Sequence, residues 1–134
     1  MEYVTVEGCE FDIYENGILN TNGEITVTSI ASLNSKVEGK GIYTNLMVSV
    51  MGYSAISPDI QPWVSGSGAT IEPAQISASA QNTKIDNFPV VLEGDEATNV
   101  TILGLKQEGS TTVSAQVNVT IKVRSAGQQY MKAE

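Results

Sequence analysis

Histidine is absent from the 134 residues of this sequence, and Cys9 is its only cysteine. Histidine supplies most of the general bases that work near neutral pH and most zinc ligands, so its absence excludes Ser-His-Asp and Cys-His catalysis. A single cysteine excludes an intrachain disulfide and a cluster of thiolates that holds zinc. We therefore expect a protein that is not an enzyme and that binds neither a cofactor nor a metal ion.

Basic residues are few. The sequence holds seven Lys and Arg and fifteen Asp and Glu, so its formal net charge is -8. It has no run of basic residues that could follow a phosphate backbone. We therefore exclude nucleic acid as an expected partner. We interpret the acidity as a surface charge that keeps the folded chain soluble.

Long apolar runs are missing as well. No run approaches the about 20 residues that a membrane-spanning helix needs. Residues 1–6 lack the basic start and the apolar core of a secretory signal. We therefore expect a chain that is made in the cytoplasm without a signal peptide and that has no membrane span.

The residues that are plentiful suit β-structure. Hydrophobic residues make up 41% of the chain and charged residues 16%, so there is enough apolar material for a core and too little charge for a disordered tail. Most other residues are Ser, Thr, Asn, Gln and Gly, which favour strand surfaces and turns. The length fits one domain, so we expect residues 1–134 to form a single β domain.

Three segments alternate polar and apolar residues with the period of a half-buried strand, namely 24–30, 44–51 and 111–124. The last is longer than an ordinary strand, which predicts a bend or a bulge in it. A further strand is predicted at 83–92, and the Pro- and Gly-rich segment 53–68 is the longest predicted loop. We therefore predict an all-β fold, a single-domain antiparallel β-sandwich or barrel of eight or nine short strands.

An internal similarity relates two segments that lie 48 residues apart. Residues 35–43, SKVEGKGIY, align without gaps with residues 83–91, TKIDNFPVV, and share a hydroxyl, a lysine, a β-branched residue and an acid in that order. Two interpretations stay open. Either the chain holds two related β units, near 35–52 and 83–104, or unrelated hairpins have converged on one pattern.

Two places in the sequence hold residues suited to a binding site. Glu93 and Asp95 belong to an acidic turn whose oxygens suit Ca²⁺, but the turn lacks the spaced ligands of a calcium loop, which favours a solvated acidic turn. Trp63 follows Pro62 in the long loop, where it either stacks a ligand such as a sugar or holds the loop against a sheet. Trp63, Glu93 and Asp95 are the candidate binding or interface residues.

The segment TKIDNFPVVLEGD, at residues 83–95, resembles the recurring turn-strand unit of PAAR-like proteins. In that unit a strand, a short polar turn, an apolar pair and Gly-Asp follow in this order. PAAR-like proteins cap the central spike of contractile injection machines and phage tails, so the resemblance implies a small β-rich piece at or near such a tip. The metal-binding histidines of the family have no counterpart here, so the resemblance implies no metal site.

Two functional hypotheses follow. The first is a noncatalytic structural component of a phage or contractile injection particle, such as a spike-tip-like, decoration or tail protein. Its partners are then other structural proteins of the virion or particle, and further copies of the chain where it forms a homo-oligomer. The alternative is a β-sandwich module that binds a carbohydrate or another ligand through Trp63 and the acidic turn.

Overall fold

The computed structural model describes residues 1–20 and 22–134. The described residues form fourteen β-strands and one short 3₁₀ turn, Pro58–Ile60, and no α-helix occurs among them. All described strand pairs are antiparallel, which confirms the predicted all-β class. A helix with the length and apolar character needed to cross a membrane is not found in the described part of the chain.

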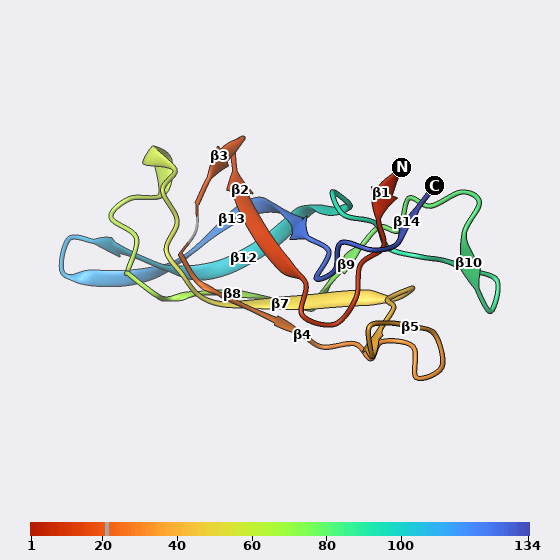
Figure 1. The fold of residues 1–134 in the computed structure, drawn as a ribbon. Helices are drawn as coiled ribbons and strands as arrows, with labels where there is room; N and C mark the ends of the chain where they lie inside the picture. The colour runs from red at the N-terminus through yellow and green to blue at the C-terminus, as the bar shows by residue number, and fades with distance from the viewer. Residues whose placement is uncertain (21) are drawn as a thin grey trace.

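Eight strands form one large sheet. They run in the order β3-β2-β13-β12-β8-β7-β4, and β9 also pairs with β7. Their bounds are β2 Glu10–Glu15, β3 Ile18–Leu19, β4 Glu24–Val27, β7 Leu46–Tyr53, β8 Gly68–Thr70, β9 Ala74–Ile76, β12 Glu96–Glu108 and β13 Thr111–Ser125. Figure 1 shows the sheet folded into two layers, with β2, β13 and β12 above β7, β8 and β4. This arrangement is that of a sandwich whose two layers belong to one continuous sheet.

The main hydrophobic core fills the space between the two layers. Strand β7 shows how the sequence builds it, because Leu46, Val48 and Val50 are fully buried while the residues between them are more exposed. Strand β13 alternates in the same way from Val117 to Val123. Burial of one apolar face per strand is the main driving force for this packing.

The three strands with the clearest predicted alternation are confirmed as β4, β7 and β13, although β4 ends at Val27 and not at residue 30. The register of β13 against β2 shifts between Val123 and Ser125, which confirms the predicted irregularity in the long strand. The predicted loop at 53–68 is confirmed as well, since it connects the end of β7 to the start of β8 and contains the 3₁₀ turn.

The segment 83–92, which we predicted as one strand, forms a hairpin instead. Asp86 and Asn87 have φ angles of +53° and +71°, and two consecutive residues with positive φ reverse the chain in a tight turn. The strands β10, Lys84–Ile85, and β11, Phe88–Pro89, pair on either side of that turn. Periodicity cannot detect such a turn, because the alternation of the two arms continues across it.

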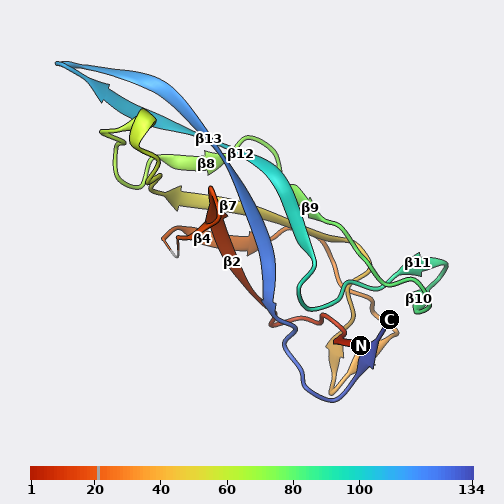
Figure 2. The ribbon, with the colours of Figure 1, turned by 90° about the horizontal axis from the view of Figure 1, so that it is seen from above.

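Three short antiparallel strand pairs gather at one end of the molecule. Two are hairpins and the third joins the two ends of the chain; we call all three hairpins, and the group the three-hairpin lobe. Their strands are β5 Lys36–Val37 with β6 Lys40–Gly41, β10 with β11, and β14 Lys132–Ala133 with β1 Glu2–Tyr3. Figures 1 and 2 place all three at the same end of the large sheet, with both chain termini among them. A second hydrophobic cluster holds the lobe together, and its buried members are Val4, Val6, Ile42, Ala80, Val90, Leu92 and Ala133.

Candidate functional sites

Trp63 anchors the long loop between β7 and β8. The residue is only 8% exposed, and its Nε1 donates a hydrogen bond to the backbone carbonyl of Tyr53 at 3.2 Å. The ring lies against Gly104 of β12, where an added Cβ would be 2.2 Å from the ring atom Cζ2. The structure therefore places Trp63 inside the fold, with its ring covered by the protein.

Glu93 and Asp95 line one open cleft beside β13. Asp95 is buried, and its carboxylate accepts hydrogen bonds from the N–H of Leu92 at 2.8 Å, the N–H of Ser79 at 3.0 Å and the Ser79 hydroxyl at 2.5 Å. The Glu93 carboxylate accepts one from the N–H of Ala126 at 3.0 Å. Asp95 therefore fixes the local turn at Leu92 and joins it to Ser79, and Glu93 joins the turn to the segment at Ala126.

The structure does not bring Trp63 together with the acidic pair. Trp63 forms a β-bridge with Lys106, which pairs with Val113 near the start of β13. The carbonyl of Asp95, in contrast, accepts from the N–H of Val123 near the end of β13. Ten residues of strand separate these two points, which is about 33 Å at about 3.3 Å per residue. Among the described residues, no three acidic or thiol side chains converge closely enough to hold a metal ion.

Three backbone segments meet at the centre of the three-hairpin lobe. The N–H of Tyr43 donates to the carbonyl of Thr5 at 3.0 Å, the N–H of Thr5 to that of Val91 at 2.8 Å, and the N–H of Val91 to that of Tyr43 at 2.9 Å. The three bonds form a closed cycle in which each segment donates once and accepts once. The cycle therefore gives the three segments equivalent backbone contacts, a threefold pattern of hydrogen bonds.

Matched hydrogen bonds extend this threefold relation into the hairpins. In each hairpin, the backbone N–H of the residue after the second strand donates to the backbone carbonyl of the residue before the first strand. These bonds are Ile42 to Ser35 at 3.0 Å, Val90 to Thr83 at 3.2 Å and Val4 to Met131 at 3.0 Å. Successive acceptors are 48 residues apart in the chain. Two of the hairpins close in tight turns, and the third has the two chain termini at the corresponding place (Figure 1).

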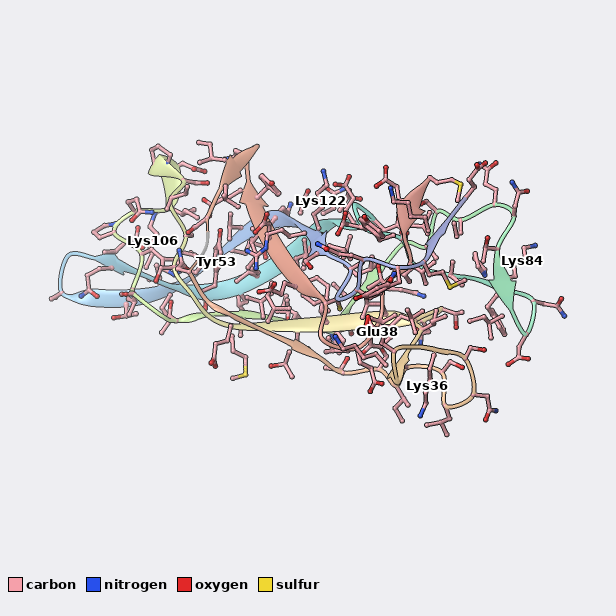
Figure 3. All side chains as sticks on the ribbon, in the orientation of Figure 1. Lys36, Glu38, Tyr53, Lys84, Lys106 and Lys122 are labelled. Atoms are coloured by element: carbon pink, nitrogen blue, oxygen red, sulfur yellow. The ribbon has the colours of Figure 1, made fainter. Side chains whose placement is uncertain are left out.

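The side chains of the lobe follow the same pattern. The first strand of each hairpin begins with an exposed lysine, Lys36, Lys84 or Lys132. The residue after each lysine packs into the lobe, as Val37, Ile85 and Ala133 do. Figure 3 shows Lys36 and Lys84 on two separate hairpins that extend away from the large sheet. The three hairpins therefore place an exposed lysine and a residue that packs into the lobe at matching backbone positions.

The lobe is electrically neutral although the chain is strongly acidic. Its hairpins, residues 1–3, 36–41, 84–89 and 132–134, contain four of the seven basic residues and four of the fifteen acids. The rest of the chain therefore carries the whole formal charge of -8. A neutral surface on an acidic protein can approach a partner without the repulsion that the remaining surface exerts.

The internal similarity in the sequence relates segments 35–43 and 83–91, which form two of these hairpins, and does not include the third. Residues 132–134, KAE, repeat the lysine-apolar-acid order of residues 36–38 and 84–86 at the same spacing of 48. The partner strand of this hairpin, β1, lies at the other end of the chain, so a comparison of continuous segments does not detect it. Lys132, which matches Lys36 and Lys84, was the sequence signal that could have identified the third hairpin.

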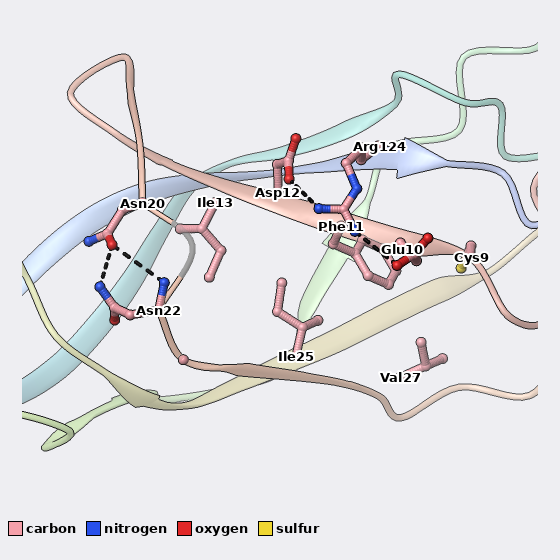
Figure 4. A pocket seen from close by; sticks show the side chains of 11 residues that line it. Cys9, Glu10, Phe11, Asp12, Ile13, Asn20, Asn22, Ile25, Val27 and Arg124 are labelled. Atoms are coloured by element: carbon pink, nitrogen blue, oxygen red, sulfur yellow. Dashed lines mark hydrogen bonds and ion pairs between the residues drawn. The ribbon is translucent and has the colours of Figure 1, made fainter.

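A cleft of about 360 Å³ lies where the two ends of the large sheet approach each other (Figure 4). Its apolar lining comes from Phe11 and Ile13 of β2 and from Ile25 and Val27 of β4. Arg124 lies at the rim, where its guanidinium contacts the carboxylates of Glu10 and Asp12 at 3.0 Å each. The cleft is therefore an open groove between two sheet edges, with an ion-paired rim.

Cys9 lies in this groove and is half-buried. Burial raises the pKa of its thiol from 9.0 to about 11, and a backbone hydrogen bond lowers it only in part. At pH 8 the folded protein should therefore alkylate about 100-fold more slowly than the chain unfolded in urea, because only the thiolate reacts. Iodoacetamide labelling followed by mass spectrometry measures the two rates. Equal rates would show that the thiol is not shielded.

Glu15 is the most buried charged residue, with no exposed surface, at the end of β2. Its carboxylate accepts hydrogen bonds from the Tyr53 hydroxyl at 2.6 Å, from the N–H of Ile56 at 3.0 Å and from the N–H of Ser57 at 2.6 Å. The Ser57 hydroxyl donates to it as well. This side chain therefore attaches the start of the long loop to the other layer of the sandwich.

Burial by itself raises the pKa of Glu15, but the hydrogen bonds from Ser57, Tyr53 and Ile56 lower it by more, so the net pKa lies below 4.5. Burial and the hydrogen bond to Glu15 raise the pKa of Tyr53. Glu15 is therefore ionised at neutral pH and its lone pairs are occupied by the protein, which makes it a structural group.

Comparison of the chain with protein-family models, with curated proteins and with solved structures finds no match. The functional assignment therefore depends on the geometry described above. The main feature of this geometry is the threefold arrangement of hairpins within one chain.

Proposed function

We propose that the chain is a noncatalytic structural component of a phage or contractile injection particle. In this proposal it acts as a tip-like cap, and the three-hairpin lobe seats it on a partner with threefold symmetry. The observation that carries the proposal is the closed cycle of hydrogen bonds among Thr5, Tyr43 and Val91. A threefold partner offers three identical surfaces around its axis, and a single chain matches them only when it offers three equivalent surfaces itself.

Two further features support this function. The lobe is neutral, whereas the rest of the chain repels other acidic surfaces. The segment 83–95 resembles the turn-strand unit of PAAR-like proteins, and its hairpin is one of the three. Together they favour a partner that meets the lobe and leaves the large sheet free.

The arrangement of neighbouring genes is the first test. Genes for a sheath, a tube or a baseplate beside the gene for this chain would support the proposal. A position inside an operon of metabolic enzymes, away from any particle genes, would contradict it.

Charge reversal on the lobe is the second test. We expect the variant Lys36→Glu with Lys84→Glu to be depleted at least about tenfold from purified particles, because both exposed lysines lie on the proposed contact surface. The matched control is Lys106→Glu with Lys122→Glu, which makes the same charge change on the large sheet. Mass spectrometry of gradient-purified particles measures the content of each variant. Equal retention of both double variants would contradict the proposed surface.

A further inference from the structure

A polar groove crosses the outer face of the layer that contains β2, β13 and β12. It consists of two adjoining concavities, of about 360 Å³ and about 210 Å³, which share Asn16 and Asn118 in their linings. Tyr14, Asn99 and Thr120 line the first, and Ser57 and Gln116 line the second. The groove begins where β2 ends and the chain turns away from β13.

The described lining of the groove holds one charged residue although the chain is strongly acidic. Amide and hydroxyl side chains provide most of its polar groups, and Asp59 in the smaller concavity is the one charged residue among the described residues that line it. The more exposed positions of β13 here are Ser114, Gln116, Asn118 and Thr120, all uncharged. A neutral polar surface disfavours an ionic ligand, and its small apolar share disfavours a lipid.

Two amides in the groove have fixed orientations. Thr101 donates its hydroxyl hydrogen to Oδ1 of Asn118 at 3.0 Å, which leaves the Nδ2 of Asn118 as a donor toward a ligand. Nδ2 of Asn16 donates to the Ser57 hydroxyl at 3.1 Å, which leaves the Oδ1 of Asn16 as an acceptor. A donor and an acceptor in the lining of the same concavities match a sugar hydroxyl, which accepts and donates at the same oxygen. Ser57 is itself held by Glu15.

Asn99 brings a third amide to the groove from a strained backbone position. It has a φ of +54°, and it lies in the register shift of β12 between Ala97 and Val100. A residue other than glycine pays conformational energy for this geometry, and bulges of this kind redirect a side chain out of the regular strand pattern. The half-buried Tyr14 adds aromatic surface, which suits the apolar face of a pyranose ring.

We propose that this groove binds a neutral oligosaccharide. The two adjoining concavities suit a ligand of more than one sugar ring, with Asn16 and Asn118 at the junction between the rings. The proposal is independent of the particle assignment, because it concerns the large sheet and not the three-hairpin lobe.

The test uses the full chain on an array of neutral, sialylated and sulfated glycans, and then titration with maltotriose, cellotriose and chitotriose followed by NMR. Asn99→Gly removes one amide and suits the positive φ, so the fold is kept. Asn118→Asp keeps the acceptor for Thr101 and loses the outward donor. Asn34→Ala is the matched control, an exposed asparagine outside the groove.

We expect binding of neutral glycans and shifts of the amide signals of Tyr14, Asn99 and Asn118. Each groove variant should bind about tenfold more weakly, as expected for the loss of one or two hydrogen bonds, and the control should bind as the wild type does. Binding of sialylated or sulfated glycans alone would overturn the proposal. So would a complete lack of glycan binding, or equal affinity in all variants.

Discussion

Replacement of Glu15 by alanine is expected to lower the free energy of unfolding by about 3 to 5 kcal/mol, because it leaves buried donors without an acceptor. These donors are the Tyr53 hydroxyl and the backbone N–H groups of Ile56 and Ser57. Urea unfolding followed by Trp63 fluorescence measures the loss, since Trp63 packs at the other end of the same loop. The matched control is Glu10→Ala, a carboxylate of the same strand whose side chain is 62% exposed.

The Glu10→Ala control should lower the free energy of unfolding by less than about 1 kcal/mol, because exposed ion pairs contribute little.

The pH dependence of stability is a second test of the same Glu15 contact. Since the folded pKa of Glu15 lies below its unfolded value of 4.5, its contribution is fully present above about pH 4.5 and is lost as the pH falls through the folded pKa. The stability difference between wild type and Glu15→Gln should therefore narrow below pH 4.5. A difference that is constant from pH 7 to pH 3 would contradict the ionised, hydrogen-bonded state.

Replacement of Val90 by aspartate is expected to open the three-hairpin lobe. Val90 is fully buried beside Val4 and Ile42, so an aspartate there costs about 3 kcal/mol or more through an unpaired buried carboxylate. The amides of Thr5 and Tyr43 should then exchange with deuterium about 100-fold faster. Exchange in the centre of the large sheet should change much less, because Val90 belongs to the second cluster and not to the main core.

The matched control for this variant is Phe88→Asp. Phe88 lies two residues away on the same hairpin and is 64% exposed, so the same charge there should leave the exchange of the lobe unchanged. Wild-type protection of Thr5 and Tyr43 in Val90→Asp would show that the second cluster does not hold the lobe together.

Three strands of the large sheet were predictable because their polar and apolar residues alternate. A half-buried strand repeats every two residues, and β4, β7 and β13 all show that period in the sequence. Their order in the sheet was not predictable, because pairing depends on contacts between residues far apart in the chain. The hairpin of β14 with β1 is the extreme case, since it joins Lys132 to Tyr3.

The contacts of the candidate site residues were not predictable for the same reason. Trp63 and Asp95 stand out in the sequence, but their partners, Tyr53 and Ser79, come from segments that only the fold brings close. Glu15 was not singled out, although a signal was present. It occupies the same face of its strand as Phe11 and Ile13, and a carboxylate on the apolar face of a strand indicates a buried polar anchor.

The central claim is that one chain offers three equivalent surfaces to a threefold partner. Quantitative mass spectrometry of purified particles with isotope-labelled peptide standards tests it most directly, because it counts copies of this chain against copies of the protein that contacts it. The account predicts one copy of the chain for every three copies of that partner. Equal numbers of the two proteins would mean that each hairpin lobe meets a single partner subunit, and would contradict the claim.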